Sequence, residues 1–202
     1  CKKSNKMTIE QLLSEHNLDA LLISSPSHIT YLTKYSGFSI TEREAYLIIT
    51  KNASYLLTDG RYTEAVRNIP GFTLIEISPT KSLTVILADL AKKHNIQKLG
   101  FEADNLTVAE YKKIKKCFQI VTNISLNELR IIKAENEIKQ IEKACALGDK
   151  TFDFILGKIK EGVTEKELAF EIEFYIKKAG ADISFTPIVA FGKNSAIPHH
   201  QT

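Results

Sequence analysis

The 202-residue sequence predicts an α/β domain that leads into a second region of different character. Strand-like and helix-like segments alternate between residues 72 and 122, which is typical of parallel strands joined by helices. Two earlier strand-like runs, 44–50 and 53–58, are separated by Lys51-Asn52 and predict an antiparallel hairpin. After residue 133, apolar residues recur three and four positions apart, as expected for a long amphipathic helix.

The composition excludes several classes of protein. Hydrophobic residues make up 44% and charged residues 25% of the chain, which is the balance of a folded domain and not of a disordered one. The apolar runs are strand-sized, far below the roughly 20 residues of a membrane-spanning helix. The net charge is only +3, and the lysines are spread along helical faces. We therefore expect neither a membrane nor a nucleic acid as a partner.

The three cysteines are Cys1, Cys117 and Cys145, and their spacing contains no CxxC pair. An odd number of widely spaced cysteines favours free thiols in a reducing cytoplasm. The first six residues fit either a processed lipoprotein end or an artefact upstream of Met7. The artefact is favoured, because a helix start follows Met7 directly.

The first domain is predicted over residues 7–123. It opens with a helix to about His16, because Thr8-Ile-Glu-Gln11 forms a capping box. A second capping box, Thr107-Val-Ala-Glu110, starts a later helix. The other expected elements are the strand 19–24, a short helix after Ser25-Pro26, the hairpin, the helix 61–68, the strand 72–77, the helix 83–94, the strand 98–102, the helix 108–116 and the strand 118–122.

A linker is expected over 124–133 and a second, incomplete domain over 134–202. Its first helix, 134–160, carries one apolar stripe predicted to face a core: Ile138, Ile141, Cys145, Gly148, Phe152, Ile155 and Ile159. A glycine within that stripe suggests that another backbone packs closely there. Asp149 and Asp153 fall on the opposite, solvated face. Thr164-Glu-Lys-Glu167 caps a second helix, which runs to Lys178 and whose inner face is Leu168, Ile172, Tyr175 and Ala179.

The last part of the chain is predicted to be an apolar strand, Phe185 to Phe191, followed by a turn around Gly192 and a tip at Pro198-His199-His200. A stiff strand end is a suitable place to hold a polar group over a cleft. Adjacent side chains of an extended segment point in opposite directions, so only one histidine can face a given site. His16, His28 and His94 lie at expected helix ends or loops, where solvated histidines are the default. From these residues alone, the role of the two terminal histidines stays open.

No phosphate-binding loop, GxSxG elbow or HExxH motif is present. Taken together and in order, however, five segments resemble the Xaa-Pro aminopeptidase and prolidase family, the pita-bread metallopeptidases that also include creatinase. The segments are Thr58-Asp-Gly-Arg-Tyr62, Leu99-Gly-Phe-Glu102, residues 129–138, Gly162-Val-Thr-Glu-Lys-Glu-Leu168 and Ile188-Val-Ala-Phe-Gly-Lys-Asn-Ser-Ala-Ile-Pro-His199. The resemblance implies a creatinase-like N-terminal α/β domain with a mixed sheet and flanking helices. The truncated start of an α+β pita-bread catalytic domain would follow.

The resemblance also implies an activity, hydrolysis of the bond before proline at the amino terminus of peptides. Family members use a pair of divalent metals, such as Mn, Co or Zn, held by two Asp, one His and two Glu. All five ligands would lie downstream of this chain, so we expect no metal or other cofactor bound here and an inactive isolated chain. His199 matches the family histidine that contacts substrate and is the expected catalytic residue. The family usually has Leu-His-Tyr where this chain has Pro198-His199-His200.

Two alternatives remain open: a non-catalytic pita-bread homologue that serves as a binding module, and a creatinase-like amidinohydrolase that works without metal. The resemblance further implies proline-containing peptides as substrates and a homodimer in the cytoplasm.

Overall fold

A computed structural model describes residues 6–202 of the chain. The alternatives for Cys1 and its neighbours therefore lie outside the described residues. The chain divides into two compact units, the first ending at Ile132 and the second running from Lys133 to Thr202. Each unit is described by itself. Within the described part, no helix is both long and apolar enough to cross a membrane.

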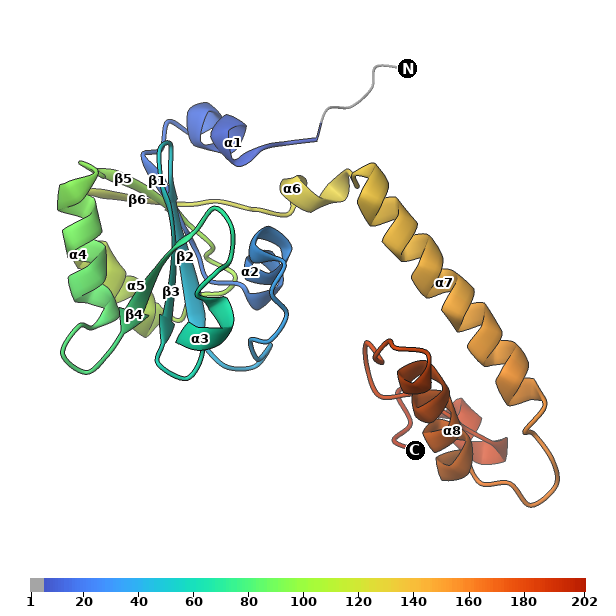
Figure 1. Ribbon diagram of the computed structural model, residues 1–202. Coiled ribbons are helices and arrows are strands. Elements are labelled where there is room, and N and C mark those ends of the chain that lie inside the picture. The colour runs from blue at the N-terminus through green and yellow to red at the C-terminus, as the bar shows by residue number, and fades with distance from the viewer. Residues whose placement is uncertain (1–5) are drawn as a thin grey trace. The chain divides into compact units, whose positions relative to one another are not determined.

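The first unit is built around a six-stranded mixed sheet in the order β4-β3-β2-β1-β5-β6 (Figure 1). The strands are β1 (Ala20–Ile23), β2 (Ala45–Thr50), β3 (Ser54–Asp59), β4 (Thr73–Ile77), β5 (Lys98–Phe101) and β6 (Ile120–Asn123). Strand β2 is antiparallel to both of its neighbours, β1 and β3, whereas β4 pairs parallel with β3, and β5 and β6 continue parallel from β1. The prediction of an α/β fold with an antiparallel portion is confirmed.

Strand β1 lies at the centre of this sheet, and all four of its residues are buried. Ala20 is paired with Thr50 of β2 on one side and with Leu99 of β5 on the other. Because both faces of the sheet are covered, the strand reads as a continuous apolar run and does not alternate. Leu21 and Ile23 enter one core, and Ala20 and Leu22 enter the other.

Helices cover the two faces of the sheet. Residues of α1 (Ile9–Glu15), α2 (Pro26–Thr33), α3 (Thr63–Val66) and α6 (Glu128–Ile131) contribute to the core that contains Leu21. Residues of α4 (Leu83–Lys93) and α5 (Val108–Ile114) contribute to the core on the other face, and the short 3-10 helix η1 (Lys115–Cys117) follows α5. The capping boxes at Thr8 and Thr107 are both formed, as predicted.

Gly100 of β5 is a position where this packing depends on glycine. A Cβ at Gly100 would lie 2.6 Å from Leu21 Cδ2 and 2.7 Å from Leu18 Cδ1. Both distances are shorter than van der Waals contact, so glycine lets the side chains of the neighbouring strand and loop close over β5. The next residue, Phe101, pairs with Leu22 of β1, and Glu102 accepts a hydrogen bond from the amide of Ser24, just after β1 ends.

The second unit contains α7 (Glu135–Leu156), α8 (Glu165–Lys178) and a short 3-10 helix, η2 (Gly192–Ala196). The capping box at Thr164 forms as predicted. Helix α7 ends at Leu156, four residues earlier than expected. Ile124, Leu126 and Leu129, from the segment expected to be a linker, are buried in the core of the first unit.

Three predictions for the second unit are wrong. The apolar stripe of α7 does not face a core: Ile138, Ile141 and Phe152 are 41–64% exposed, and only Ile155 of the stripe is buried. No backbone packs at Gly148, where an added Cβ would meet no described atom within 4 Å. The expected strand from Phe185 to Phe191 is also absent from the described residues. A strand needs a backbone partner, and the amides of Val189 and Phe191 bond to side chains instead.

Candidate functional site

A cluster of hydrogen bonds in the second unit, which includes His200, centres on Glu165 in the first turn of α8. One carboxylate oxygen, Oε1, accepts a hydrogen bond from the amide of Phe191 at 2.6 Å and from Asn194 Nδ2 at 2.9 Å. The other, Oε2, lies 3.0 Å from Asn194 Nδ2 and 3.1 Å from His200 Nε2. A single carboxylate therefore ties three points of the C-terminal segment to one helix.

Local sequence explains why Glu165 is free to do this. Thr164 and Glu167 satisfy each other's backbone amides in the capping box, so the box does not use the side chain of Glu165. An acidic residue in the first turn also interacts favourably with the helix dipole. The hydrogen bonds from Phe191, Asn194 and His200 lower the pKa of Glu165, so the carboxylate form is favoured.

The segment held by Glu165 is a loop closed at both ends. Thr202 Oγ1 accepts from the Val189 amide and donates to the Val189 carbonyl, both at 2.9 Å. Between these points the chain turns through η2, and Gly192 has a φ of 51°, a left-handed conformation that glycine adopts without strain. The predicted turn around Gly192 and Asn194 is present, although no strand precedes it.

The two terminal histidines have different environments. The side chain of His200 is 16% exposed and faces Glu165. His199 is exposed, has a φ of 53°, and makes no hydrogen bond to any described residue. The structure thus brings His200 into the cluster and leaves His199 facing solvent. The expected role of His199 stays a prediction.

Sequence reasoning missed Glu165 and Asn194. The capping box contains two glutamates, and only Glu167 is needed to close it, which was the available signal for a free carboxylate at Glu165. The contact partner could not be read from the sequence, because Asn194 lies 29 positions further along the chain.

The histidines predicted to be solvated also differ from one another. His16 is exposed, as expected. His94 accepts or donates a hydrogen bond of 2.7 Å with the Tyr55 hydroxyl. His28 is buried, with Nδ1 lying 2.5 Å from Glu102 Oε1, so the prediction is wrong for this residue. Glu102 is 74 positions away and is brought to His28 only by the pairing of β1 with β5.

A metal pair would need several carboxylates and a histidine in one place. Within residues 6–202, no group of three or more His, Cys, Asp or Glu side chains is arranged to hold a metal ion. Glu165 and His200 form only a pair, and their third neighbour is the amide of Asn194. The described residues therefore do not fit a metal centre, and they can position a histidine but not activate a metal-bound water.

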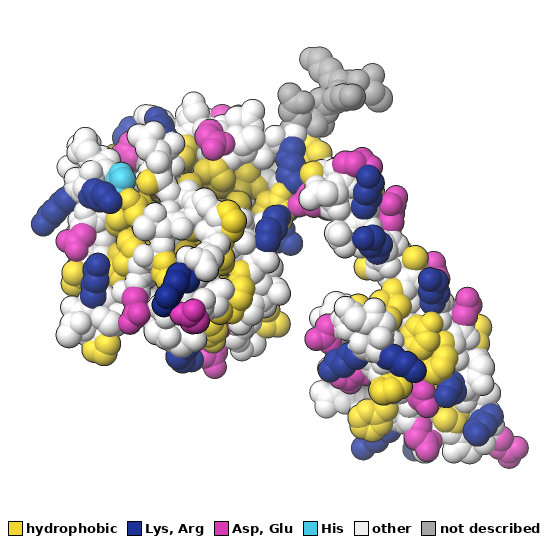
Figure 2. Space-filling view, viewed as in Figure 1, with side chains coloured by type: hydrophobic (Ala, Val, Ile, Leu, Met, Phe, Trp, Pro, Cys, Tyr) yellow, Lys and Arg dark blue, Asp and Glu magenta, His cyan; other side chains and the backbone are white. Residues whose placement is uncertain are grey.

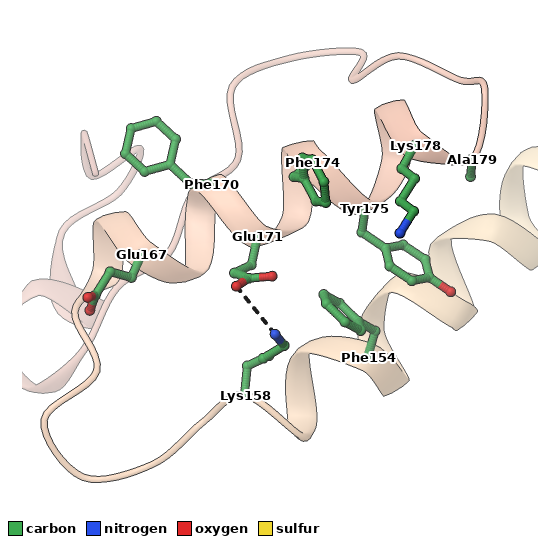
Figure 3. Close-up of a pocket in the computed structure, with 9 residues that line it drawn as sticks. All are labelled: Phe154, Lys158, Glu167, Phe170, Glu171, Phe174, Tyr175, Lys178 and Ala179. Atoms are coloured by element: carbon green, nitrogen blue, oxygen red, sulfur yellow. Dashed lines mark hydrogen bonds and ion pairs between the residues drawn. The ribbon is translucent and has the colours of Figure 1, made fainter.

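A large hollow of about 860 Å³ lies elsewhere in the second unit, between the end of α7 and the face of α8 (Figure 3). Phe154 stacks on Tyr175 with ring centroids 4.5 Å apart, and Lys158 Nζ lies 3.3 Å from Glu171 Oε1. Phe170 and Phe174 are 70% and 64% exposed. Figure 2 shows hydrophobic side chains gathered on this unit. The hollow is lined by no histidine and is separate from the Glu165 cluster.

Comparison with protein families gives two matches that follow one another along the chain. Residues 7–141 match the creatinase/prolidase N-terminal domain, and residues 139–202 match metallopeptidase family M24. A putative Xaa-Pro aminopeptidase from Mycoplasma genitalium is 34% identical over 97% of this chain and 54% of its own length. An uncharacterized peptidase from Bacillus subtilis is 33% identical over 95% of this chain and 54% of its own length. The chain thus spans about half the length of the curated relatives it matches.

Solved structures of similar proteins are also peptidases of which this chain covers about half. The X-Pro aminopeptidase from Thermotoga maritima superposes with a TM-score of 0.78 and 26% identity, covering 93% of this chain and 55% of that one. A prolidase from Thermococcus sibiricus has a TM-score of 0.78 and 28% identity, covering 98% of this chain and 57% of that one.

Proposed function

Because the chain belongs to the creatinase/prolidase N-terminal domain family, we propose that it supplies the first domain, and the beginning of the catalytic domain, of an Xaa-Pro peptidase. The observation that carries the proposal is the order of the two matches, the N-terminal domain first and the metallopeptidase family second. Relatives that cover nearly the whole chain bear the names Xaa-Pro aminopeptidase and prolidase. The reaction would be hydrolysis of the bond between an amino-terminal residue and proline.

Membership of a metallopeptidase family implies a divalent metal. Because the described residues do not fit a metal centre, we propose that the metal, Mn, Co or Zn, is held by residues of the enzyme outside this chain. The 202-residue chain by itself would then have no peptidase activity.

His199 is proposed to contact the substrate. Its side chain is free of other hydrogen bonds among the described residues, and it lies between Pro198 and His200. Proline limits backbone freedom on one side, and the contact of His200 with Glu165 restrains the other. Glu165 would then act as a positioning residue for the loop that carries His199, through its contact with His200.

The substrates would be proline-containing peptides, and the assembly a homodimer. The free thiols of Cys117 and Cys145 support a reducing location such as the cytoplasm.

The test is hydrolysis of Ala-Pro, Gly-Pro and creatine by the full-length gene product, with and without a chelator, alongside the 202-residue chain. We expect the full-length protein to cleave the dipeptides, chelator to abolish cleavage, and the 202-residue chain to be inactive. Hydrolysis of creatine, or no hydrolysis at all by a folded, metal-loaded protein, would overturn the proposal in favour of a creatinase-like enzyme or a binding module.

A further inference from the structure

The second unit leaves many of its large hydrophobic side chains exposed. Among its described residues, only two hydrophobic side chains are buried, Ile155 of α7 and Leu168 of α8. Phe170, Phe174 and Phe185 are instead 70%, 64% and 73% exposed. Exposed apolar side chains that lie close together on a surface are typical of an interface, because their contact with water is unfavourable. A partner that covers this surface is therefore expected.

Two parts of this surface are helical. The first is the hollow of about 860 Å³ between the end of α7 and the face of α8, which is walled by aromatic rings (Figure 3). The second is the apolar stripe of α7, on which Ile138, Ile141 and Phe152 are exposed. We call the hollow and the stripe together the apolar face. A face of this kind accepts apolar side chains from another layer of structure.

The third part is an unpaired backbone edge in the segment 185–191. In an extended chain, successive amides point to opposite edges. On one edge, the amides of Val189 and Phe191 donate to side chains of the loop and of α8. On the other edge, the amides of Ile188 and Ala190 have no hydrogen-bond partner among the described residues. A strand can therefore pair with this second edge without disturbing the Glu165 cluster.

The matches to relatives indicate what covers these surfaces. The match to metallopeptidase family M24 begins at residue 139, so nearly all of the second unit belongs to it. The chain spans only about half the length of the relatives. The covering part must bring both a strand that can pair and an apolar face that can pack on helices. A β-sheet with one apolar face provides both.

We propose, on the basis of the proposed function, that the part of the peptidase that follows Thr202 covers the apolar face with a β-sheet. One strand of that sheet pairs with the edge at Ile188 and Ala190, and apolar side chains of the same sheet fill the hollow and pack along the stripe of α7. The segment 185–191 then becomes the strand that its apolar residues predict. The same partner buries the stripe of α7, so one missing neighbour accounts for both departures from the sequence-based expectation.

The chain carries its own probe of this surface. Cys145 lies on the apolar stripe of α7 and is exposed, whereas Cys117 lies in the first unit and is partly buried. The experiment compares the alkylation of both thiols by iodoacetamide in the 202-residue chain and in the full-length gene product, measured by mass spectrometry of the peptides. Because alkylation requires access to the thiol, we expect Cys145 to react at least about tenfold more slowly in the full-length protein. Cys117 should react equally in both.

Hydrogen exchange tests the backbone edge. The amides of Ile188 and Ala190 should exchange at least about tenfold more slowly in the full-length protein than in the 202-residue chain, because a strand protects them there. Both measurements use the native sequence, so neither depends on a variant that fails to fold.

A pair of variants tests the hollow. Phe170→Ser should lower the thermal unfolding midpoint of the full-length protein by several degrees, because the ring is buried against the covering sheet. The same change should have little effect in the 202-residue chain, where Phe170 is 70% exposed. Val108→Ser is the matched control, because Val108 is 69% exposed on α5 of the first unit. It should leave both midpoints nearly unchanged.

Several results would overturn the proposal. These are equal alkylation of Cys145 in the two proteins, equally fast exchange at Ile188 and Ala190, or equal midpoints of the two full-length variants. Protection of Cys145 that rises with the concentration of the 202-residue chain would assign the apolar face to a second copy and would also contradict it. None of these readouts measures hydrolysis. A protein that protects Cys145 but cleaves no peptide contradicts the proposed function alone, and an active peptidase with a reactive Cys145 contradicts the covering sheet alone.

Discussion

Glu165 Oε2 lies 3.1 Å from His200 Nε2, and this contact joins the first turn of α8 to the loop that carries the terminal histidines. The same carboxylate holds Phe191 and Asn194. The first turn of α8 and three positions of the later loop, Phe191, Asn194 and His200, are thereby held together by one side chain.

Replacing Glu165 with alanine should release this loop without unfolding α8. The Thr164–Glu167 capping box remains, whereas the amide of Phe191 loses its only acceptor among the described residues. We expect severalfold faster hydrogen exchange at the Phe191 amide and unchanged exchange in the middle of α8. Glu173→Ala is the matched control, because Glu173 pairs with Lys177 on the surface of the same helix and with no other described residue. Equal exchange at Phe191 in both variants would show that Glu165 does not hold the loop.

Glu102→Gln should destabilise the first unit by about 2–3 kcal/mol, because an amide cannot replace a buried carboxylate that accepts three hydrogen bonds. Urea unfolding followed by far-UV circular dichroism measures the loss. Glu128→Gln, at an exposed glutamate of α6 in the same unit, is the control and should change stability by less than about 0.5 kcal/mol.

The same substitution should alter the response to acid. The pKa of Glu102 is lowered in the folded chain, so its contribution is present above the unfolded value of about 4.3 and is lost as the pH falls through the lower folded value. Unfolding midpoints of the native chain should therefore decline more steeply than those of Glu102→Gln below about pH 5. Parallel curves would contradict a lowered pKa at Glu102.

Two glycine-to-alanine substitutions should change the free energy of unfolding in opposite directions. Gly100→Ala places a methyl group 2.6 Å from Leu21 Cδ2 and should cost about 1–3 kcal/mol through overpacking. Gly148→Ala, on α7, meets no described atom and should stabilise the helix by about 1 kcal/mol through propensity alone. Thermal unfolding of the two variants tests both effects. Loss of stability in Gly148→Ala would mean that another part of the protein packs against this position.

Local signals were enough to predict most elements of the first unit. The capping boxes at Thr8 and Thr107 and the hairpin turn at Lys51-Asn52 each depend on residues within four positions of one another. Sequence reasoning failed where the partner is distant. The run from Phe185 to Phe191 is apolar enough for a strand but has no neighbouring strand among the described residues. His28 was expected to be solvated because its local sequence gives no sign of Glu102.

In the candidate site, too, the local features could be predicted and the distant contacts could not. The Pro198-His199-His200 motif and the turn before it could be recognised from the sequence, but the carboxylate that fixes them could not. Periodicity on α7 gave the apolar stripe correctly and its burial incorrectly, because the pattern identifies a face without identifying what covers it.

The central position of β1 has a consequence for biosynthesis. Its antiparallel partner β2 follows closely in the sequence, whereas its parallel partner β5 ends at Phe101. As the chain leaves the ribosome, β1, β2 and β3 can associate while one edge of β1 is still unpaired. That edge is covered only after β5 has emerged. The nascent chain therefore passes through a stage in which the fully apolar strand β1 has an exposed edge. Chaperone binding should be concentrated at β1 during this stage.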